Sequence, residues 1–172
     1  MRFLIIIPIA LAVLVGFAFE IALSPLPSRT LTFEEQHCSC QIPYNWIIVK
    51  RSQGEFEATR VLGGTFVLYA KPEARSVDVT KPSFANALKS RMTASGHVIT
   101  SDDVALFHGC PAYSYSFHKR INGYDIHTYT VTFFVNRYLY ALAISQRYSD
   151  PTKDDGLMTA LNSFALLDSN PH

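Results

Sequence analysis

A tight turn constrains this chain more than any other feature of its sequence. Asn-Gly at residues 122–123 separates two long segments, and this dipeptide is typical of a two-residue type I′ hairpin turn. Residues 111–119 before it alternate aromatic and small side chains, while residues 124–135 after it are rich in Thr, Val, Tyr and Phe. A second tight turn at 136–137 leads into another such segment, 138–146. The pattern predicts a three-stranded antiparallel meander.

The two turns also predict the register of the meander. They place Arg120 opposite Asp125 and His118 opposite His127. One sheet face then carries Val131, Phe133, Leu142 and Ile144, and the other carries Tyr113, Tyr115, Thr130, Thr132, Ala141 and Ala143. Neither face is plainly polar, and the alanines would let a helix lie close. We therefore expect helices to cover at least part of both faces.

Further strands and two helices are expected outside the meander. The strand segments are 36–42, 64–70, 97–100 and 103–108, and the helical segments are 82–95 and 151–166. We expect Thr80 to cap the first helix and Asp150 to cap the second. The fold class predicted is α+β, a central antiparallel sheet of about six strands flanked by helices in an α/β/α sandwich.

The N-terminal segment has the pattern of an export signal. Residues 3–19 carry no charge, Arg2 precedes them and Glu20 ends them. The apolar run is also at the short end of what spans a bilayer. Two alternatives stay open: residues 1–20 are a signal peptide cleaved before Phe19, or they remain as a membrane anchor.

Either alternative places the rest of the chain outside the cytoplasmic membrane, because Arg2 favours the cytoplasmic side. Residues 21–32 contain Pro25 and Pro27 and are expected to form a linker. The folded domain is expected at 33–168. It would be periplasmic or secreted, and tethered through residues 3–19 if these are kept.

Composition excludes two classes of protein. The chain is 48% hydrophobic and 17% charged, whereas disordered chains have low hydrophobicity and high charge. Basic and acidic residues nearly balance, at 15 and 14, and no basic stripe is visible. Nucleic-acid binding draws most of its affinity from Lys and Arg on phosphates, so no nucleic-acid partner is expected.

The sequence lacks the familiar catalytic motifs. It contains no Gly-x-Ser-x-Gly elbow, no His-Glu-x-x-His pair, no phosphate-binding glycine loop and no dinucleotide fingerprint. We expect no enzymatic activity and no cofactor. A hydrolase without a recognisable motif is kept as the last of our three hypotheses about function; the other two are given below. It is kept because a catalytic triad is defined by the geometry of its side chains and not by a sequence motif.

Three cysteines in an exported chain raise the question of oxidation. Cys38 and Cys40 share a strand face, about 6.6 Å apart, which is too far for an easy mutual disulfide. A disulfide from Cys110 to Cys38 or to Cys40 is one alternative. Buried free thiols are the second, and a metal or redox role that includes His37 is the third.

The predicted register brings two histidines together. His118 and His127 would lie on neighbouring strands, with Asp125 two residues along the same face. These three residues are the candidate metal ligands. The alternative is an exposed polar pair near the hairpin turn, because the spacing supplies no further strong ligand.

Several short motifs resemble the Mog1/PsbP/DcrB-like group. They are Pro-Tyr-Asn-Trp at 43–46, Gly-Cys-Pro-Ala-Tyr at 109–113, Tyr-Leu-Tyr-Ala-Leu at 138–142 and Asn-Ser-Phe at 162–164. The resemblance covers about residues 33–167 and implies a central antiparallel sheet between helices. It also implies a non-enzymatic, protein-associating module with no shared catalytic motif. The chain departs from the lipoprotein members, because no lipobox precedes Cys38.

The first hypothesis is therefore an exported or membrane-tethered accessory module of the cell envelope, which docks to an envelope or membrane protein complex. The second is a periplasmic metal- or small-ligand-binding protein that uses His118, His127 or the cysteines.

Overall fold

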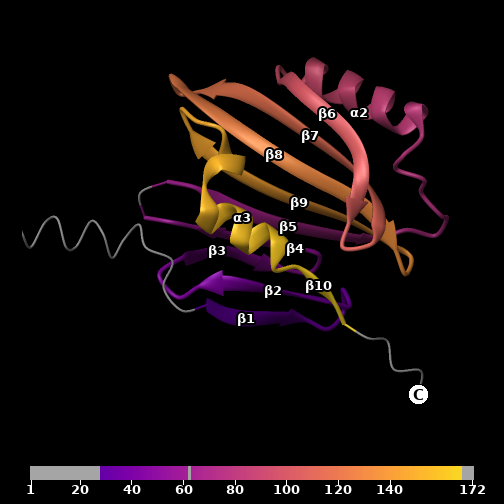
Figure 1. Ribbon diagram of the computed structural model, residues 1–172, viewed down its shortest axis with the longest axis horizontal. Coiled ribbons are helices and arrows are strands. Elements are labelled where there is room, and N and C mark those ends of the chain that lie inside the picture. The colour runs from indigo at the N-terminus through magenta and orange to yellow at the C-terminus, as the bar shows by residue number, and fades with distance from the viewer. Residues whose placement is uncertain (1–27, 62, 168–172) are drawn as a thin grey trace, which may run out of the picture.

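A computed structural model of the protein describes residues 28–61 and 63–167 (Figure 1). They form an α+β fold with a seven-stranded antiparallel sheet, in the order β3-β4-β5-β9-β8-β7-β6, and a three-stranded sheet, in the order β1-β2-β10. The apolar segment 3–19 and the expected cleavage before Phe19 lie outside the described residues. No helix among those described has the length and apolar character to span a membrane.

The large sheet consists of β3 (Ile47–Ser52), β4 (Glu55–Thr59), β5 (Thr65–Pro72), β6 (Val98–Phe107), β7 (Cys110–Ile121), β8 (Tyr124–Val135) and β9 (Tyr138–Arg147). The small sheet consists of β1 (Ser28–Phe33), β2 (Cys38–Pro43) and β10 (Ala165–Leu166). The helices are α2 (Pro82–Ala94), the 3₁₀ turn η1 (Pro151–Lys153) and α3 (Asp155–Asn162).

The predicted meander is confirmed as β7, β8 and β9. Asn122 and Gly123 have φ of 50° and 84°, the left-handed backbone that a type I′ turn requires at both central residues. The register is also as predicted, with Arg120 opposite Asp125 and His118 opposite His127. The large sheet has seven strands where the sequence predicted about six.

The main core lies on one face of the large sheet, here called the α3 face. The side chains of Val131, Phe133, Leu142 and Ile144 are buried there, as predicted, against α3. Phe164, just after α3, packs its ring 5.3 Å from Phe133 and 5.4 Å from Tyr140.

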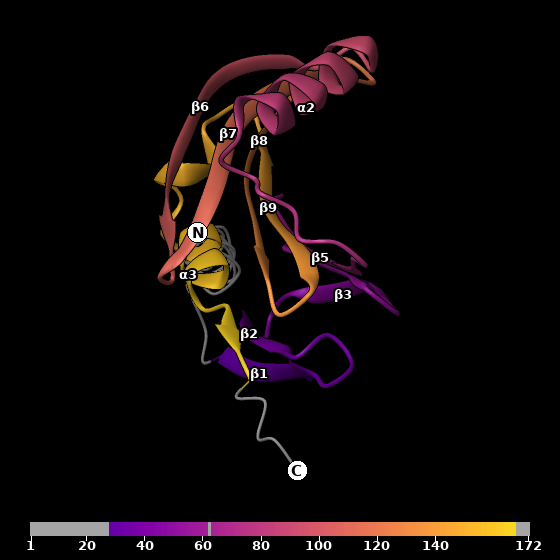
Figure 2. The same cartoon turned by 90° about the vertical axis from the view of Figure 1, so that its right-hand side faces the viewer.

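The opposite face, here called the α2 face, is covered more loosely. Tyr113, Tyr115 and Phe117 stack along β7 with ring centroids 5.6 and 5.8 Å apart. Helix α2 packs on this row near the β6 edge of the sheet. Helix α3 lies on the opposite face, against β9 (Figure 2). The hydrophobic cluster beneath α2 includes neither Ala141 nor Ala143. Helix α2 therefore does not pack over these two alanines, where the sequence led us to expect a helix.

The expected helix over 151–166 is wrong, because two carboxylates start two separate turns. Asp150 accepts the N–H of Thr152 and begins η1, and Asp154 accepts the N–H of Leu157 and begins α3. The chain then leaves the helix, and residues 165–166 pair with β2.

Other boundaries also differ from expectation. The segments 97–100 and 103–108 form one strand, β6, with an irregularity between Ile99 and Ser101. Thr80 does not cap α2, because its hydroxyl donates to Asp78 instead. Strand β1 occupies residues 28–32 of the expected linker 21–32, and residues 21–27 lie outside the described chain. The described fold therefore begins before Phe33.

Candidate functional site

A cleft of about 770 Å³ opens at one end of the large sheet. We call it the sheet-end cleft. The loop between β4 and β5 forms one wall, and the end of β9 with the following Tyr148 forms the other. The described lining residues are Thr59, Arg60, Val61, Gly63, Gly64, Thr65, Ile126, Ser145, Gln146, Arg147 and Tyr148.

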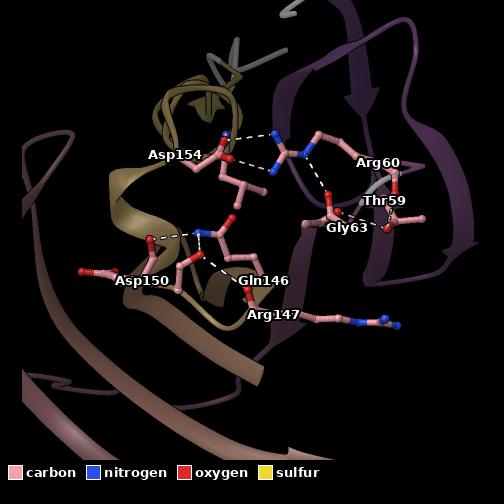
Figure 3. Close-up of polar contacts among 10 residues, drawn as sticks. Thr59, Arg60, Gly63, Gln146, Arg147, Asp150 and Asp154 are labelled. Atoms are coloured by element: carbon pink, nitrogen blue, oxygen red, sulfur yellow. Dashed lines mark hydrogen bonds and ion pairs between the residues drawn. The ribbon is translucent and has the colours of Figure 1, made fainter. Parts of the chain in front are cut away.

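Arg60 fixes the loop wall of the cleft. Its two terminal nitrogens lie 2.7 and 3.2 Å from the carboxylate oxygens of Asp154, and its Nε donates to the carbonyl of Gly63 at 2.9 Å (Figure 3). The side chains of Arg60 and Asp154 are only 12% and 21% exposed. Because bidentate pairs are geometrically specific, this contact holds the β4–β5 loop against the start of α3.

The β9 wall of the cleft is fixed by polar side chains. The Gln146 amide donates to the Ser149 hydroxyl at 2.9 Å and to the Asp150 carbonyl at 3.0 Å. The Ser145 hydroxyl lies 2.9 Å from that of Thr128. These groups are already paired, so they shape the cleft more than they offer binding capacity.

Arg147 is the lining residue whose charged group is available to bind a ligand or a partner. Its guanidinium lies 4.5 Å from the ring centre of Tyr124, and the rings of Tyr124 and Tyr148 meet edge to face at 6.0 Å. It forms no ion pair with any carboxylate of the described residues, and Figure 3 shows it extending away from Asp150. We call Tyr124, Arg147 and Tyr148 the Arg147 cluster. Its charge can receive a carboxylate or a phosphate.

Tyr148 occupies an unusual backbone conformation. Its φ is 65°, a region that costs a residue with a side chain free energy unless the surroundings hold it there. The Tyr148 N–H donates to the Asp125 carbonyl at 2.9 Å, which fixes the turn. The side chain is 66% exposed. The ring is therefore presented to solvent by a constrained backbone.

The predicted metal ligands lie only partly together. The rings of His118 and His127 are 5.6 Å apart and inclined by 37°. Asp125 lies opposite Arg120 near the turn. The described residues contain no group of three or more His, Cys, Asp or Glu side chains arranged to hold a metal ion. Metal binding by the histidine pair stays a prediction without an identified third ligand.

The three cysteines are free thiols in the structure. Cys38 and Cys40 are fully buried, and burial raises the pKa of each thiol to about 12. Cys110 is half-buried at the start of β7. A thiol with so high a pKa is a poor nucleophile and a poor metal ligand at neutral pH. The disulfide from Cys110 to Cys38 or Cys40 stays a prediction.

Nothing in the sequence indicated the sheet-end cleft. Its fixed wall joins Arg60 to Asp154, which are 94 residues apart, and neither belongs to a recognisable motif. The glycines 63–64 indicated only a turn before a strand. Arg147 and Tyr148 follow the last predicted strand without a periodic pattern, so only the folded structure brings them beside Tyr124.

Comparison with known proteins supports the fold. No family model and no curated protein matches the sequence. The Ran-binding protein Mog1p of Saccharomyces cerevisiae is similar in structure with a TM-score of 0.57 at 7% identity, over 83% of this chain and 97% of that one. LpqN of Mycobacterium tuberculosis, which is involved in cell envelope biogenesis, gives 0.54 at 12% identity, over 82% and 86%.

A protein of Bacteroides thetaiotaomicron gives a TM-score of 0.58 at 9% identity over 83% of this chain, which spans 50% of that structure's length. Likeness at such low identity concerns the fold alone. The fold that the sequence resemblance implied is confirmed.

Proposed function

We propose that this chain, which has the Mog1/PsbP-like fold, is a non-enzymatic accessory module that binds a protein partner outside the cytoplasmic membrane. Its helices would complete the α/β/α sandwich of that fold. The N-terminal residues 3–19 would export the chain and, if kept, tether it to the membrane. The partner would belong to an envelope or membrane protein complex.

The Arg147 cluster carries this proposal. Arg and Tyr are enriched among the residues that dominate protein–protein binding, because they combine large contact area with specific polar contacts. Here an unpaired guanidinium stacks on Tyr124 and lies beside Tyr148. The constrained backbone of Tyr148 reduces the conformational entropy that binding would cost. The cleft next to the cluster would accept a partner segment that carries a carboxylate.

The fold neighbours are compatible with this proposal. Mog1p binds the protein Ran, and LpqN is involved in cell envelope biogenesis. Neither partner nor pathway transfers on fold alone. What the neighbours support is the coarser statement that this architecture serves as an accessory, protein-associating module.

The test is site-specific photo-crosslinking in cells that make the full chain. A photo-reactive amino acid replaces Tyr148, 66% exposed, and in a matched control it replaces Tyr44, 61% exposed. We expect one discrete crosslinked protein at position 148 and none at 44. Arg147→Glu should abolish that crosslink, and Arg75→Glu, on the exposed loop after β5, should not. A crosslink that survives Arg147→Glu would contradict the proposal.

The same cells test localisation. The N-terminus of the recovered protein, measured by mass spectrometry, shows whether residues 1–18 are removed. Fractionation shows whether the chain is membrane-bound or free outside the cytoplasmic membrane. Recovery of the chain from the cytoplasm with its N-terminus intact would contradict the proposed location.

A second candidate function is the binding of a small anionic ligand. The cleft volume of about 770 Å³ lies in the range of small-molecule sites, roughly 300–1,000 Å³. Inorganic phosphate and short dicarboxylates are suitable probes, because a ligand that binds only the native state raises the unfolding temperature. Stabilisation that disappears in Arg147→Glu but persists in Arg75→Glu would favour this candidate. The same assay with Zn²⁺ tests His118 and His127.

A further inference from the structure

Strand β6 forms one edge of the large sheet, and its outer side has no neighbouring strand among the described residues (Figure 1). It is ten residues long, and every residue from Thr100 to Leu106 is exposed. A long edge strand presents unpaired backbone N–H and C=O groups, onto which another extended segment can pair. Most proteins shorten or cover such an edge.

The hairpin between β6 and β7 determines which backbone groups of β6 point outward. Phe107 and Cys110 flank a two-residue turn, so they exchange backbone hydrogen bonds, and the alternation gives Ala105 the same role. The N–H and C=O groups of Asp102, Val104 and Leu106 therefore point to the outer edge.

Two observations agree with this assignment. Leu106 lies opposite Pro111, which has no N–H to donate. The N–H of Val104 donates to the carboxylate of Asp103, at 2.8 Å, and not to β7.

The side chains along this edge place two exposed apolar groups beside Asp102 on one sheet face and the carboxylate of Asp103 on the other. Val104 and Leu106 lie on the α2 face and are 49% and 73% exposed. Asp103 lies on the α3 face and forms no ion pair with a described residue. Asp102 already has partners, since Lys89 lies 2.8 Å and the Tyr113 hydroxyl 2.9 Å from its carboxylate.

We infer that the β6 edge binds an extended basic segment of a partner protein, which adds an eighth strand to the large sheet. Paired antiparallel, the segment would place apolar side chains opposite Leu106 and Val104 and a Lys or Arg opposite Asp103. The expected pattern along the partner is apolar, any residue, apolar, basic. This surface is separate from the sheet-end cleft, so the inference does not rest on the proposed function.

A second copy of this chain fits the edge less well than a basic segment. If β6 paired with itself so that Asp103 faced Asp103, two carboxylates would meet on one sheet face. If Val104 faced Val104, each Leu106 would lie against the Asp102 of the other copy. Neither arrangement supplies a positive charge for Asp103, whereas a basic segment does.

The test uses the full chain in mild detergent and a blocked synthetic peptide of about nine residues that alternates Val with Lys and Thr. A control peptide carries Glu in place of Lys. We expect the Lys peptide to bind at least about tenfold more tightly at low salt, with the difference shrinking at high salt. Hydrogen exchange should show new protection at the amides of Asp102 and Leu106.

Variants locate the binding surface. Leu106→Lys and Asp103→Lys should each weaken peptide binding by about tenfold or more. Val49→Lys, on the opposite edge strand β3 and 57% exposed in the native chain, should not. Arg147→Glu should also leave peptide binding unchanged, which separates this inference from the proposed function.

Three results would overturn the inference. The two peptides could bind equally, or Val49→Lys could weaken binding as much as Leu106→Lys does. Sedimentation could instead show a concentration-dependent dimer that Leu106→Lys disrupts, and the edge would then belong to a second copy.

Discussion

Asp154 combines two structural roles in one side chain. One carboxylate oxygen accepts the Leu157 N–H and caps α3, and both oxygens bind the Arg60 guanidinium. Asp154→Ala removes the cap and leaves a largely buried guanidinium without its partner. We expect it to lower the free energy of unfolding by about 2–3 kcal/mol, measured by urea denaturation.

The neighbouring Asp155 is the matched control for this change. It is exposed and lies in the first turn of the same helix, and its side chain has no hydrogen-bonded partner in the described structure. Asp155→Ala should cost less than half as much, because it loses only a favourable interaction with the helix dipole. Equal losses in the two variants would mean that Arg60 does not depend on Asp154.

The buried thiols predict a loss of stability in alkali. The pKa of Cys38 and of Cys40 is raised from 9.0 to about 12 by burial, so the folded state keeps both protons while the unfolded state releases them. The contribution to stability is full below pH 9 and declines as the pH rises toward 12. Between pH 9 and 10 the two thiols alone should lower the free energy of unfolding by about 2 kcal/mol.

Urea denaturation at several pH values measures this slope. Burial also raises the pKa values of Tyr113, Tyr115 and Tyr140, and tyrosine in the unfolded chain is partly ionised by pH 10, so these rings add a smaller decline over the same interval. The double variant Cys38→Ala, Cys40→Ala is less stable throughout, yet the fall in its free energy of unfolding between pH 9 and 10 should be less than half that of the native chain. An unchanged slope in that variant would assign the effect to other groups.

The two helices predict different costs for the same substitution. Leu157 of α3 is fully buried in the main core, whereas α2 buries no residue and Leu88 is only half-buried. Leu157→Ala should lower the free energy of unfolding by about 3 kcal/mol and Leu88→Ala by about 1 kcal/mol. Hydrogen exchange should be faster at α2 amides than at α3 amides buried in the core. Similar costs would mean that α2 is packed as tightly as α3.

The elements that the sequence predicted are those with a strong local signal. Asn122-Gly123 and the alternation around it determine the meander and its register without help from the rest of the fold. Strand β3 was missed because residues 47–52 run from three apolar to three polar side chains without alternation, and β4 was missed although Phe56 and Ala58 alternate with polar residues over its five positions. The helix at 151–166 was overextended, because the local sequence does not show that residues 165–166 pair with β2, a contact more than 120 residues away.

The sheet-end cleft is still less predictable, for the same physical reason. Asp154 lies within the expected helical segment 151–166, and its partner Arg60 lies beyond seven intervening elements. Arg147 meets Tyr124 only because β8 and β9 pair. The sequence gives the types of the side chains, but their convergence depends on tertiary contacts.

At the scale of the whole molecule, both ends of the described chain meet on one strand. Strand β2 pairs with β1 on one side and with β10 on the other, and the Leu167 N–H donates to the His37 carbonyl at 2.9 Å. Cys38 and Cys40 of β2 are buried in the main core, and Leu166 of β10 packs against that core. The C-terminal strand therefore closes the fold next to Cys38, and we expect it to help keep this thiol from solvent.

Two truncations test this closure. A chain that ends after Phe164 loses β10 and the contact of Leu167, so we expect its unfolding temperature to fall by about 3–8 °C. It should also react with iodoacetamide at Cys38, which mass spectrometry detects as a labelled peptide, because Leu166 no longer pairs with that residue. A chain that ends after Leu167 keeps the strand and is the control, so neither its unfolding temperature nor its labelling should change. If both truncations behaved alike, residues 165–167 would contribute nothing to closure, and the protection of Cys38 would come from β1 and α3 alone.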